Sequence, residues 1–301
     1  MAKIIVPAVT AWDVNGKPDM EATKQIIDFL IAGGVDGVLV LGSTGEFTAL
    51  SVQEKKAYLK AYAEYVDGRM ELYAGTGCIN YDETLELSNA VYEMGYRAPF
   101  VIGPCYYGMN DEQIFTYYDR LAKNLKGDMY IYNYPERSGH SVDAPVVKRL
   151  VEANKNIIGL KDTVQFPSHT NAICQATKDM HFEVYSGFDD QFLYNLCAGG
   201  SGSIGGLANI LPEVWSDLIR SANQKNYERA IQISALLYRL MPIYTQNVSC
   251  SLLFKKLMAA RGVNVAETAM FPYDEDGEEA YRKIKTIMDE VLEVYHALPQ
   301  E

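Results

Sequence analysis

Short apolar segments typical of buried strands alternate eight times with longer amphipathic segments between the N-terminus and about residue 225. The strand candidates are Ile4–Val9, Gly37–Leu41, Met70–Gly75, Ala98–Gly103, Met129–Asn133, Ile157–Lys161, Phe182–Ser186 and Gly202–Gly206. The helix candidates that follow them are Met20–Ala32, Val52–Tyr65, Tyr81–Met94, Asp111–Leu125, Ala144–Glu152, His169–Thr177, Gln191–Ala198 and Leu211–Ala222. A strand–helix unit repeated eight times predicts an α/β fold of the (β/α)8 TIM-barrel type. The alternative is an open doubly wound sheet, which usually has fewer units and a glycine-rich first turn, whereas TAWDVNGKPD follows the first strand here.

The pattern changes after about Asn226, where no strand candidates separate the helices. Three helix candidates follow one another, and they are Tyr227–Leu240, Ser249–Arg261 and Glu278–Leu298. We therefore predict two parts. Residues 1–225 form the barrel with the active site, and residues 226–301 form a C-terminal three-helix domain that covers one side of the barrel.

Composition excludes several classes of partner. The 301 residues include 27 Lys and Arg against 39 Asp and Glu, which gives a net charge of -12. An acidic surface repels phosphate backbones and anionic lipid, so we expect neither nucleic acid nor a membrane as partner. No apolar stretch approaches ~18 residues and the N-terminal apolar run is too short for a signal peptide, which predicts a cytoplasmic protein. The five cysteines and four histidines show no metal-ligand spacing, so we expect no metal site.

Small, hydroxylated and ionisable residues follow the predicted strands. The segments are GSTGE after the second strand, PCYY after the fourth, YNYP at the fifth, KDT at the sixth and GFDD after the seventh. In barrels of this type the active site is built from the C-terminal ends of the strands and the loops that follow them. The sequence therefore predicts an active site at this end of the barrel.

Lys161 and Tyr132 are the candidates for covalent and acid–base chemistry. Lys161 follows the apolar run IIGL, and burial of an amine favours its neutral form, which is the nucleophile that forms a Schiff base with a ketone. The alternative is a lysine at a strand end that reaches solvent. Tyr132 is one of three tyrosines at a spacing of two, so they share a face of the strand, and a phenol beside the lysine can move protons. The alternative is a packed aromatic residue.

Other strand-end residues are candidates for binding. Ser43 and Thr44 lie between two glycines in a turn whose N–H groups can hold a carboxylate, although an ordinary loop is the alternative. Arg137 can bind a carboxylate or phosphate, or be a surface arginine. Asp189 can bind substrate hydroxyls, or cap the helix that follows. Tyr107 can line the cleft or belong to the core.

Three of these motifs, in this order and at these strand ends, resemble the dihydrodipicolinate synthase and N-acetylneuraminate lyase family. They are GSTGE, YNYP and GLKDT, and the resemblance extends from about Lys3 to the final helix. Members of that family are pyruvate-dependent class I aldolases on a (β/α)8 barrel with a C-terminal helical domain. The resemblance implies a homotetramer, built as a dimer of dimers, and no cofactor beyond the covalent lysine imine with pyruvate.

The resemblance also implies a role for individual residues. Lys161 forms the imine with pyruvate or the keto acid, and Tyr132 moves the protons. Ser43 and Thr44 hold the carboxylate of pyruvate, and the residue at the Ser43 position also relays protons. Two further residues match family positions, Tyr107 as the aromatic residue lent to a neighbouring subunit's site and Gly205 as a small residue that lines the pocket.

The substrate class is less constrained than the reaction. VDGVLVLGSTGEF and NIIGLKDT are most similar to 2-keto-3-deoxy sugar acid aldolases, which cleave such an acid to pyruvate and an aldehyde. Synthases usually have Thr-Thr at Ser43-Thr44, and sialic acid lyases usually have an aromatic residue at Asp162. Arg137 matches the synthase arginine that holds the aldehyde's carboxylate, so 4-hydroxy-tetrahydrodipicolinate synthesis from pyruvate and aspartate semialdehyde is the alternative. An N-acetylneuraminate lyase and a non-catalytic barrel that binds keto acids rank below it.

Overall fold

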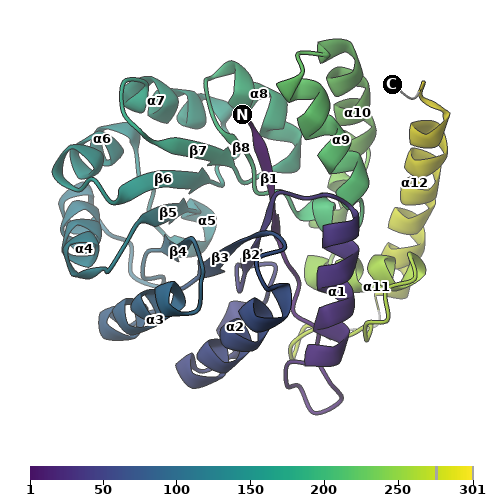
Figure 1. Cartoon of the computed structure of the whole chain (residues 1–301), viewed down its shortest axis with the longest axis horizontal. Coiled ribbons are helices and arrows are strands. Elements are labelled where there is room, and N and C mark those ends of the chain that lie inside the picture. Colours follow the sequence, from purple (N-terminus) through teal and green to yellow (C-terminus); the bar gives the residue numbers. More distant parts are fainter. Residues whose placement is uncertain (275–276, 300–301) are drawn as a thin grey trace.

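The computed structural model describes residues 1–274 and 277–299, and its centre is a closed barrel of eight parallel strands in sequence order (Figure 1). The strands are β1 (Lys3–Pro7), β2 (Gly37–Val40), β3 (Glu71–Gly75), β4 (Ala98–Ile102), β5 (Met129–Asn133), β6 (Ile157–Asp162), β7 (Glu183–Ser186) and β8 (Gly202–Ser203). The predicted (β/α)8 fold is confirmed.

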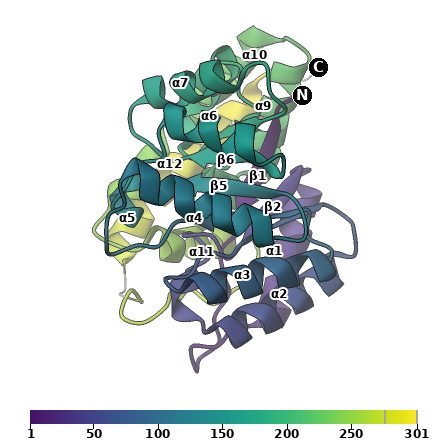
Figure 2. The same ribbon diagram turned by 90° about the vertical axis from the view of Figure 1, so that its left-hand side faces the viewer.

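A ring of helices surrounds the strands (Figure 1), and several of these helices cover the strands on the side that faces the viewer in Figure 2. These helices are α1 (Met20–Ala32), α2 (Val52–Val66), α3 (Tyr81–Glu93), α4 (Asp111–Asn124), α6 (Ala144–Ala153), α7 (Pro167–Thr177), α8 (Phe192–Cys197) and α9 (Pro212–Asn223), with a short α5 (Pro135–Ser138) directly after β5. Most predicted helix ends differ from these by one or two residues. The start of α2 shows why helix ends can be predicted from the sequence, because Ser51 and Glu54 form a reciprocal capping box there.

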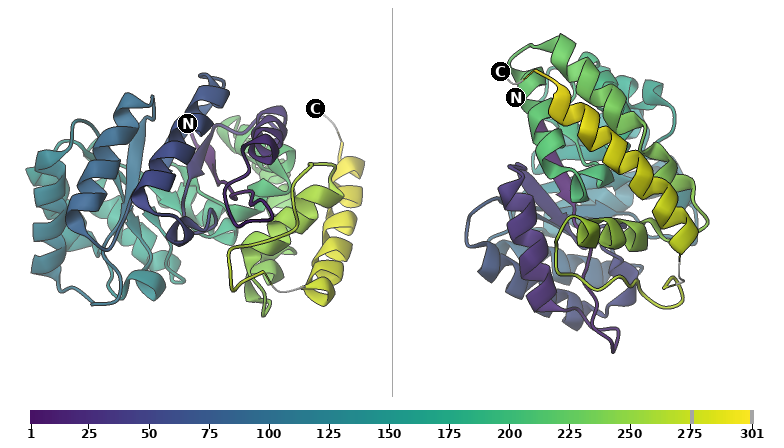
Figure 3. Two further views of the ribbon diagram at one scale, coloured as in Figure 1. Left: turned by 90° about the horizontal axis from the view of Figure 1, so that it is seen from below. Right: turned by 90° about the vertical axis from the view of Figure 1, so that its right-hand side faces the viewer.

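Three more helices follow the barrel and lie on one side of it. They are α10 (Tyr227–Tyr238), α11 (Cys250–Ala260) and α12 (Glu278–Ala297), with α12 outermost (Figure 3). Their apolar faces belong to the same core cluster as α1, α2 and α9, as Ile26, Trp215, Leu257 and Ile284 illustrate. The C-terminal helices therefore pack directly on the barrel, while the division of the chain into two domains at residue 225 stays a prediction.

The barrel interior is filled by side chains, among them Tyr73, Phe100, Tyr130 and Tyr185. Phe100 and Tyr130 are stacked with ring centroids 4.4 Å apart. This packed layer fills the barrel beneath the C-terminal ends of the strands, which is the end where barrels of this type have their active sites.

The eighth strand is shorter than predicted. The sequence predicts a strand over Gly202–Gly206, whereas β8 ends at Ser203 and a 3-10 turn begins at Gly206. The N–H groups of Gly206 and Leu207 donate to the Asp189 carboxylate at 3.2 and 3.1 Å instead of to a neighbouring strand. A side chain far away in sequence thus ends the strand, which no local pattern could indicate.

Candidate active site

A bulge in β6 sets the direction of the Lys161 side chain. Ile158 is an extra residue where β6 pairs with β5. Ile158 packs in the inner core of the barrel, and Leu160 packs in the outer core beneath the helices. A strict two-residue alternation from Ile158 would turn Leu160 inward and Lys161 outward. The extra residue reverses that alternation, so Lys161 faces into the barrel.

Lys161 and Tyr132 lie next to each other in the barrel mouth. They are paired in the β5–β6 register, and Lys161 Nζ is 4.3 Å from the centroid of the Tyr132 ring. The two side chains are 4% and 5% exposed. Burial lowers the pKa of Lys161 to about 7, although the charge of Asp189 acts in the opposite direction. The amine is thus available in its neutral, nucleophilic form near pH 7.

Ser43 extends this group across the barrel. Its Oγ is 3.3 Å from the Tyr132 hydroxyl, within hydrogen-bonding distance. Burial raises the pKa of Tyr132, and hydrogen bonding to Ser43 partly offsets that shift. The Tyr132 hydroxyl therefore stays protonated at neutral pH and can pass a proton to or from Ser43.

The β2–α2 loop is a tight turn in which two backbone N–H groups lack a protein acceptor among the described residues. Leu41 and Glu46, at its two ends, have left-handed backbones with φ of 57° and 55°. Inside the turn, Gly45 N–H donates to Gly42 and Glu46 N–H donates to Ser43. Across the described residues, the N–H groups of Ser43 and Thr44 donate to no protein acceptor. This turn can offer two N–H groups to an anion.

Glycines leave space in front of this turn. A pocket in the mouth is lined by Gly42, Ser43, Gly75, Gly77 and Tyr132, among others. A Cβ atom at Gly75 would lie 2.1 Å from the Leu41 carbonyl oxygen. The close approach of β2 and β3 at the pocket therefore requires glycine there.

Arg137 lies at the rim of the mouth. It belongs to α5, is exposed, and its guanidinium carbon is 5.9 Å from the centroid of the Tyr134 ring. Its positive charge acts on Tyr132 and partly offsets the rise of that pKa. Arg137 is thus close enough to affect a bound anion electrostatically.

Asp189 and Gly205 lie together on the β7–β8 side. Asp189 is buried and its carboxylate accepts hydrogen bonds from the Gly206 and Leu207 N–H groups and from the Tyr244 hydroxyl at 2.6 Å. Burial raises the pKa of Asp189 to about 6. A Cβ atom at Gly205 would lie 2.4 Å from Asp189 Oδ1, so this position must be small. Both carboxylate oxygens already have protein partners, and direct contact of Asp189 with substrate hydroxyls stays a prediction.

Tyr107 is not brought to Lys161 within the protomer. Tyr106 and Tyr107 are 87% and 79% exposed, and their rings contact edge to face at 5.0 Å. Tyr106 has a left-handed backbone with φ of 84°, an uncommon conformation for an aromatic residue. The loop after β4 therefore displays two aromatic rings to the outside of the chain.

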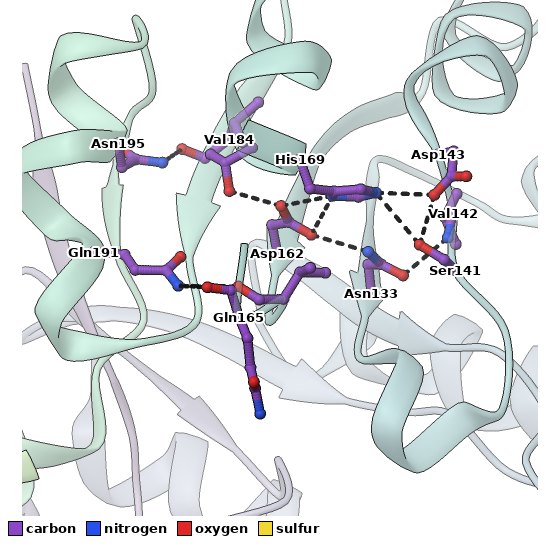
Figure 4. A network of polar contacts seen from close by, with 12 residues as sticks. Asn133, Ser141, Val142, Asp143, Asp162, Gln165, His169, Val184, Gln191 and Asn195 are labelled. Atoms are coloured by element: carbon purple, nitrogen blue, oxygen red, sulfur yellow. Dashed lines mark hydrogen bonds and ion pairs between the residues drawn. The ribbon is translucent and has the colours of Figure 1, made fainter. Parts of the chain in front are cut away.

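A polar network supports β5 and β6 from the helix side (Figure 4). Asp162, which follows Lys161, accepts hydrogen bonds from Asn133, His169 and Thr170 at 2.9, 2.9 and 2.7 Å. Asn133 follows Tyr132 in the chain, just as Asp162 follows Lys161. The hydrogen bond between Asn133 and Asp162 therefore joins β5 to β6 on the helix side of the sheet, behind Tyr132 and Lys161. The second ring nitrogen of His169 lies 3.0 Å from Asp143 Oδ1.

Sequence reasoning missed several residues near the mouth. Thr163 lies two residues after Lys161 on the same face of the chain, and its buried hydroxyl has no hydrogen-bond partner among the described residues. That spacing of two was a usable signal. Tyr244 and Cys250 come from the C-terminal segment. The Tyr244 hydroxyl donates a hydrogen bond to Asp189, and Cys250 contributes to the raised pKa of Tyr132. Nothing local in the sequence indicates that these two residues reach the barrel mouth.

Two absences hold for the described part of the chain. Residues 1–274 and 277–299 contain no group of three or more His, Cys, Asp or Glu side chains that could hold a metal ion. None of their helices is long and apolar enough to cross a membrane.

The sequence profile of the dihydrodipicolinate synthetase family matches residues 1–291. YagE of Escherichia coli K12, whose name provisionally assigns it as a 2-dehydro-3-deoxy-D-gluconate aldolase, is 29% identical over 96% of both chains. A DapA-like lyase of Thermococcus onnurineus is 31% identical over 97% of this chain and all of its own. The crystal structure of YagE in complex with pyruvate covers 97% of this chain and 98% of its own with a TM-score of 0.93. From this match and the shared fold, the chain belongs to the dihydrodipicolinate synthetase family.

Proposed function

We propose that this protein is a class I aldolase that reversibly cleaves a 2-keto-3-deoxy sugar acid to pyruvate and an aldehyde through a lysine Schiff base. The observation that carries the proposal is the buried Lys161 amine, with a pKa of about 7, beside the Tyr132 ring. The relatives support the reaction class and the substrate class. YagE is named for 2-dehydro-3-deoxy-D-gluconate, and YjhH of Escherichia coli K12, 29% identical over 95% of this chain, is named for the corresponding pentonate.

The neutral Lys161 amine attacks the keto carbon, and loss of water gives an imine that withdraws electrons from the adjacent carbons. In the cleavage direction, the hydroxyl next to the bond that breaks loses its proton, the aldehyde leaves, and an enamine remains. Protonation of the enamine gives the pyruvate imine, and hydrolysis restores the amine. Tyr132 and Ser43, 3.3 Å apart, carry these protons. The imine itself is the electron sink, so the mechanism needs no cofactor, and we expect EDTA to leave turnover unchanged.

The remaining site residues have binding roles in this proposal. The N–H groups and hydroxyls of Ser43 and Thr44 hold the carboxylate of pyruvate. Gly205 and Asp189 line the β7–β8 side of the pocket, where the rest of the sugar acid lies. Tyr107 enters the site of a neighbouring subunit, which accounts for its exposure, in a homotetramer built as a dimer of dimers. We place the enzyme in the cytoplasm.

The second candidate function is 4-hydroxy-tetrahydrodipicolinate synthesis from pyruvate and aspartate semialdehyde. The exposed Arg137 favours it, because a guanidinium at the rim can hold the carboxylate of that aldehyde. A relative named for this activity, from Methanococcus maripaludis, is 29% identical over 79% of this chain.

Arg137→Ala separates the two candidates. A hydrogen bond to a charged group contributes about 1.5–3 kcal/mol, so the synthase predicts a loss of roughly 10–150-fold in kcat/KM with aspartate semialdehyde. The aldolase predicts a small effect on cleavage of a 2-keto-3-deoxy sugar acid, because the aldehyde that leaves, such as glyceraldehyde, is neutral. A large loss with aspartate semialdehyde, together with no turnover of any 2-keto-3-deoxy acid in a panel, would replace the aldolase with the synthase.

One experiment tests the reaction class itself. Borohydride added with pyruvate should give a covalent adduct of one reduced pyruvate per chain, located on Lys161 by peptide mass spectrometry. A barrel that only binds keto acids would keep its mass, and that result would reject the proposed function.

A further inference from the structure

Glu46, the last residue of the GSTGE turn, is held by segments that lie far away in the chain. It is buried in a left-handed backbone conformation, which costs energy for any residue except glycine. Its carboxylate accepts hydrogen bonds from Trp12 Nε1 at 2.8 Å, Lys255 Nζ at 2.7 Å and the Met270 N–H at 2.8 Å. These donors belong to the loop after β1, to α11 and to the segment after α11. The C-terminal helices therefore contribute directly to the conformation of this turn.

Lys255 is the centre of this arrangement. Its side chain is 0% exposed, and besides Glu46 it donates to the Thr10 carbonyl oxygen at 3.1 Å. The Thr10 hydroxyl donates in turn to the Gly45 carbonyl oxygen at 2.7 Å. Burial lowers the pKa of Lys255, and attraction to Glu46 opposes that shift. Removing one partner of such a pair leaves the other charge buried without compensation.

Ser251 adds a second connection from the same face of α11. It lies four residues before Lys255, so the two side chains are neighbours on the helix. Its hydroxyl donates to the Thr44 carbonyl oxygen at 2.8 Å. The carbonyl groups of Thr44 and Gly45 and the carboxylate of Glu46 are thus all fixed from outside the turn. Because peptide groups are planar, fixing the Thr44 and Gly45 carbonyls also fixes the N–H groups of the residues that follow them, Gly45 and Glu46. Those two N–H groups donate to the carbonyls of Gly42 and Ser43, which share peptide planes with the Ser43 and Thr44 N–H groups and so restrict how these can point.

We propose that Lys255 is a positioning residue for keto-acid binding: by fixing the GSTGE turn from α11, it aims the Ser43 and Thr44 N–H groups at the substrate carboxylate. This inference rests on the proposed function, in which those N–H groups bind the carboxylate of pyruvate. Lys255 acts through Glu46 and the backbone of the turn, and it does not touch the substrate. The C-terminal helices then contribute to binding as well as to the core.

A buried ion pair in this place is better explained by positioning than by stability alone. Well-packed apolar residues of similar volume often stabilise a fold as well as a buried pair does or better. The apolar core around α11 is already extensive, with Leu253, Phe254 and Leu257 fully buried. Apolar side chains at these positions could not fix the backbone of the GSTGE turn, because only hydrogen bonds hold a group in a defined direction.

The test is borohydride trapping of Lys161 at graded concentrations of two ketones, pyruvate and hydroxyacetone, which lacks the carboxylate. In Lys255→Met we expect the half-saturating pyruvate concentration to rise about tenfold to a hundredfold, since small misplacements of binding groups have effects of that order. Maximal trapping and the dependence on hydroxyacetone should stay within about twofold of the unaltered enzyme. Equal changes for both ketones, or no change for pyruvate in a folded variant, would overturn the proposal.

Further variants keep the test independent of stability. The double variant Glu46→Gln with Lys255→Met removes both charges together, and Ser251→Ala removes only the hydroxyl. Both should weaken trapping by pyruvate alone, Ser251→Ala by the smaller factor. Arg229→Met is the matched control, because it breaks a largely buried ion pair with Asp217 between α9 and α10, away from the turn. Arg229→Met should leave the half-saturating concentrations of pyruvate and hydroxyacetone unchanged. A rise for pyruvate as large as that in Lys255→Met would show an effect of stability and reject the proposal.

The same experiment separates failure of this inference from failure of the proposed function. If the unaltered enzyme is not trapped by pyruvate, the Schiff-base function is wrong. If the unaltered enzyme is trapped, and Ser251→Ala and both Lys255 variants need the same pyruvate concentration as it does, the function stands and the positioning role is wrong.

Discussion

Two regions of the barrel mouth differ in how much of their surroundings one chain provides. The β5–β6 wall carries Tyr132 and Lys161, both almost fully buried, and the network of Asp162 supports it from behind. The rim after β4 carries Tyr106 and Tyr107, both largely exposed. Buried groups have environments fixed by the fold, whereas exposed aromatic side chains are available to a neighbour. One chain thus builds the Lys161–Tyr132 pair by itself, whereas the rim would be completed by a neighbouring subunit only in the homotetramer proposed above.

The largest expected effect comes from breaking the wall at Lys161. Lys161→Ala should abolish turnover and borohydride trapping, because the amine is the covalent catalyst, while circular dichroism shows an intact fold. Retained trapping in that variant would refute the assignment.

The pH dependence of the unaltered enzyme checks the environment of the same amine. Only the neutral amine attacks a ketone, and burial lowers the pKa of Lys161 to about 7. The rate of imine formation should therefore rise with pH through about 7 and then level off. A rate that still climbs steeply at pH 9 would mean that the amine is not desolvated as the structure indicates.

The next effect concerns the other side chain of the wall. Tyr132→Phe keeps the ring against Lys161 and removes only the hydroxyl, so the fold should be unaffected. Proton transfer by a positioned side chain contributes about 10²–10⁴-fold, and kcat should fall by that factor. A loss below about tenfold would indicate that water or Thr44 moves the protons instead.

The wall and the rim also differ in how well the sequence predicts them. Burial of Lys161 follows from the apolar run before it, and the glycine at position 159 was a signal for a bulge, because glycine inside a strand often marks one. The support of Glu46 by Lys255 and the hydrogen bonds of Asp189 to Gly206 could not be predicted, because these contacts join residues that are far apart in sequence. Local patterns describe strands, helices and caps, whereas such contacts depend on the closed barrel.

A smaller effect is expected at the rim. Tyr107→Phe keeps the exposed ring for packing and removes the hydroxyl that would join Ser43 and Tyr132 of a neighbouring subunit. A net hydrogen bond contributes about 0.5–1.5 kcal/mol, so kcat should fall by roughly two- to tenfold without dissociation of the oligomer. Light scattering would check the assembly and steady-state kinetics the rate. A monomeric enzyme with full activity would show that one chain completes its own site, and would remove the distinction between wall and rim.

The smallest effect concerns the support behind the wall. Burial disfavours the charged form of His169, but hydrogen bonds and attraction to Asp162 and Asp143 outweigh it, so its pKa is raised. A group whose pKa is raised in the folded state stabilises the fold fully below its unfolded pKa, about 6.5 for histidine, and that stabilisation is lost as pH rises through the folded pKa. In urea titrations, the contribution of His169 to the free energy of unfolding should therefore decrease as pH rises above about 6.5. It is measured as the difference between the unaltered protein and His169→Gln, because His140, whose pKa burial lowers, contributes with the opposite sign in both proteins. His181→Gln, at an exposed histidine, is the matched control and should keep the contribution of His169. If His169→Gln keeps the full pH dependence, the imidazolium does not stabilise the wall, and Asn133 and Thr170 are its effective support.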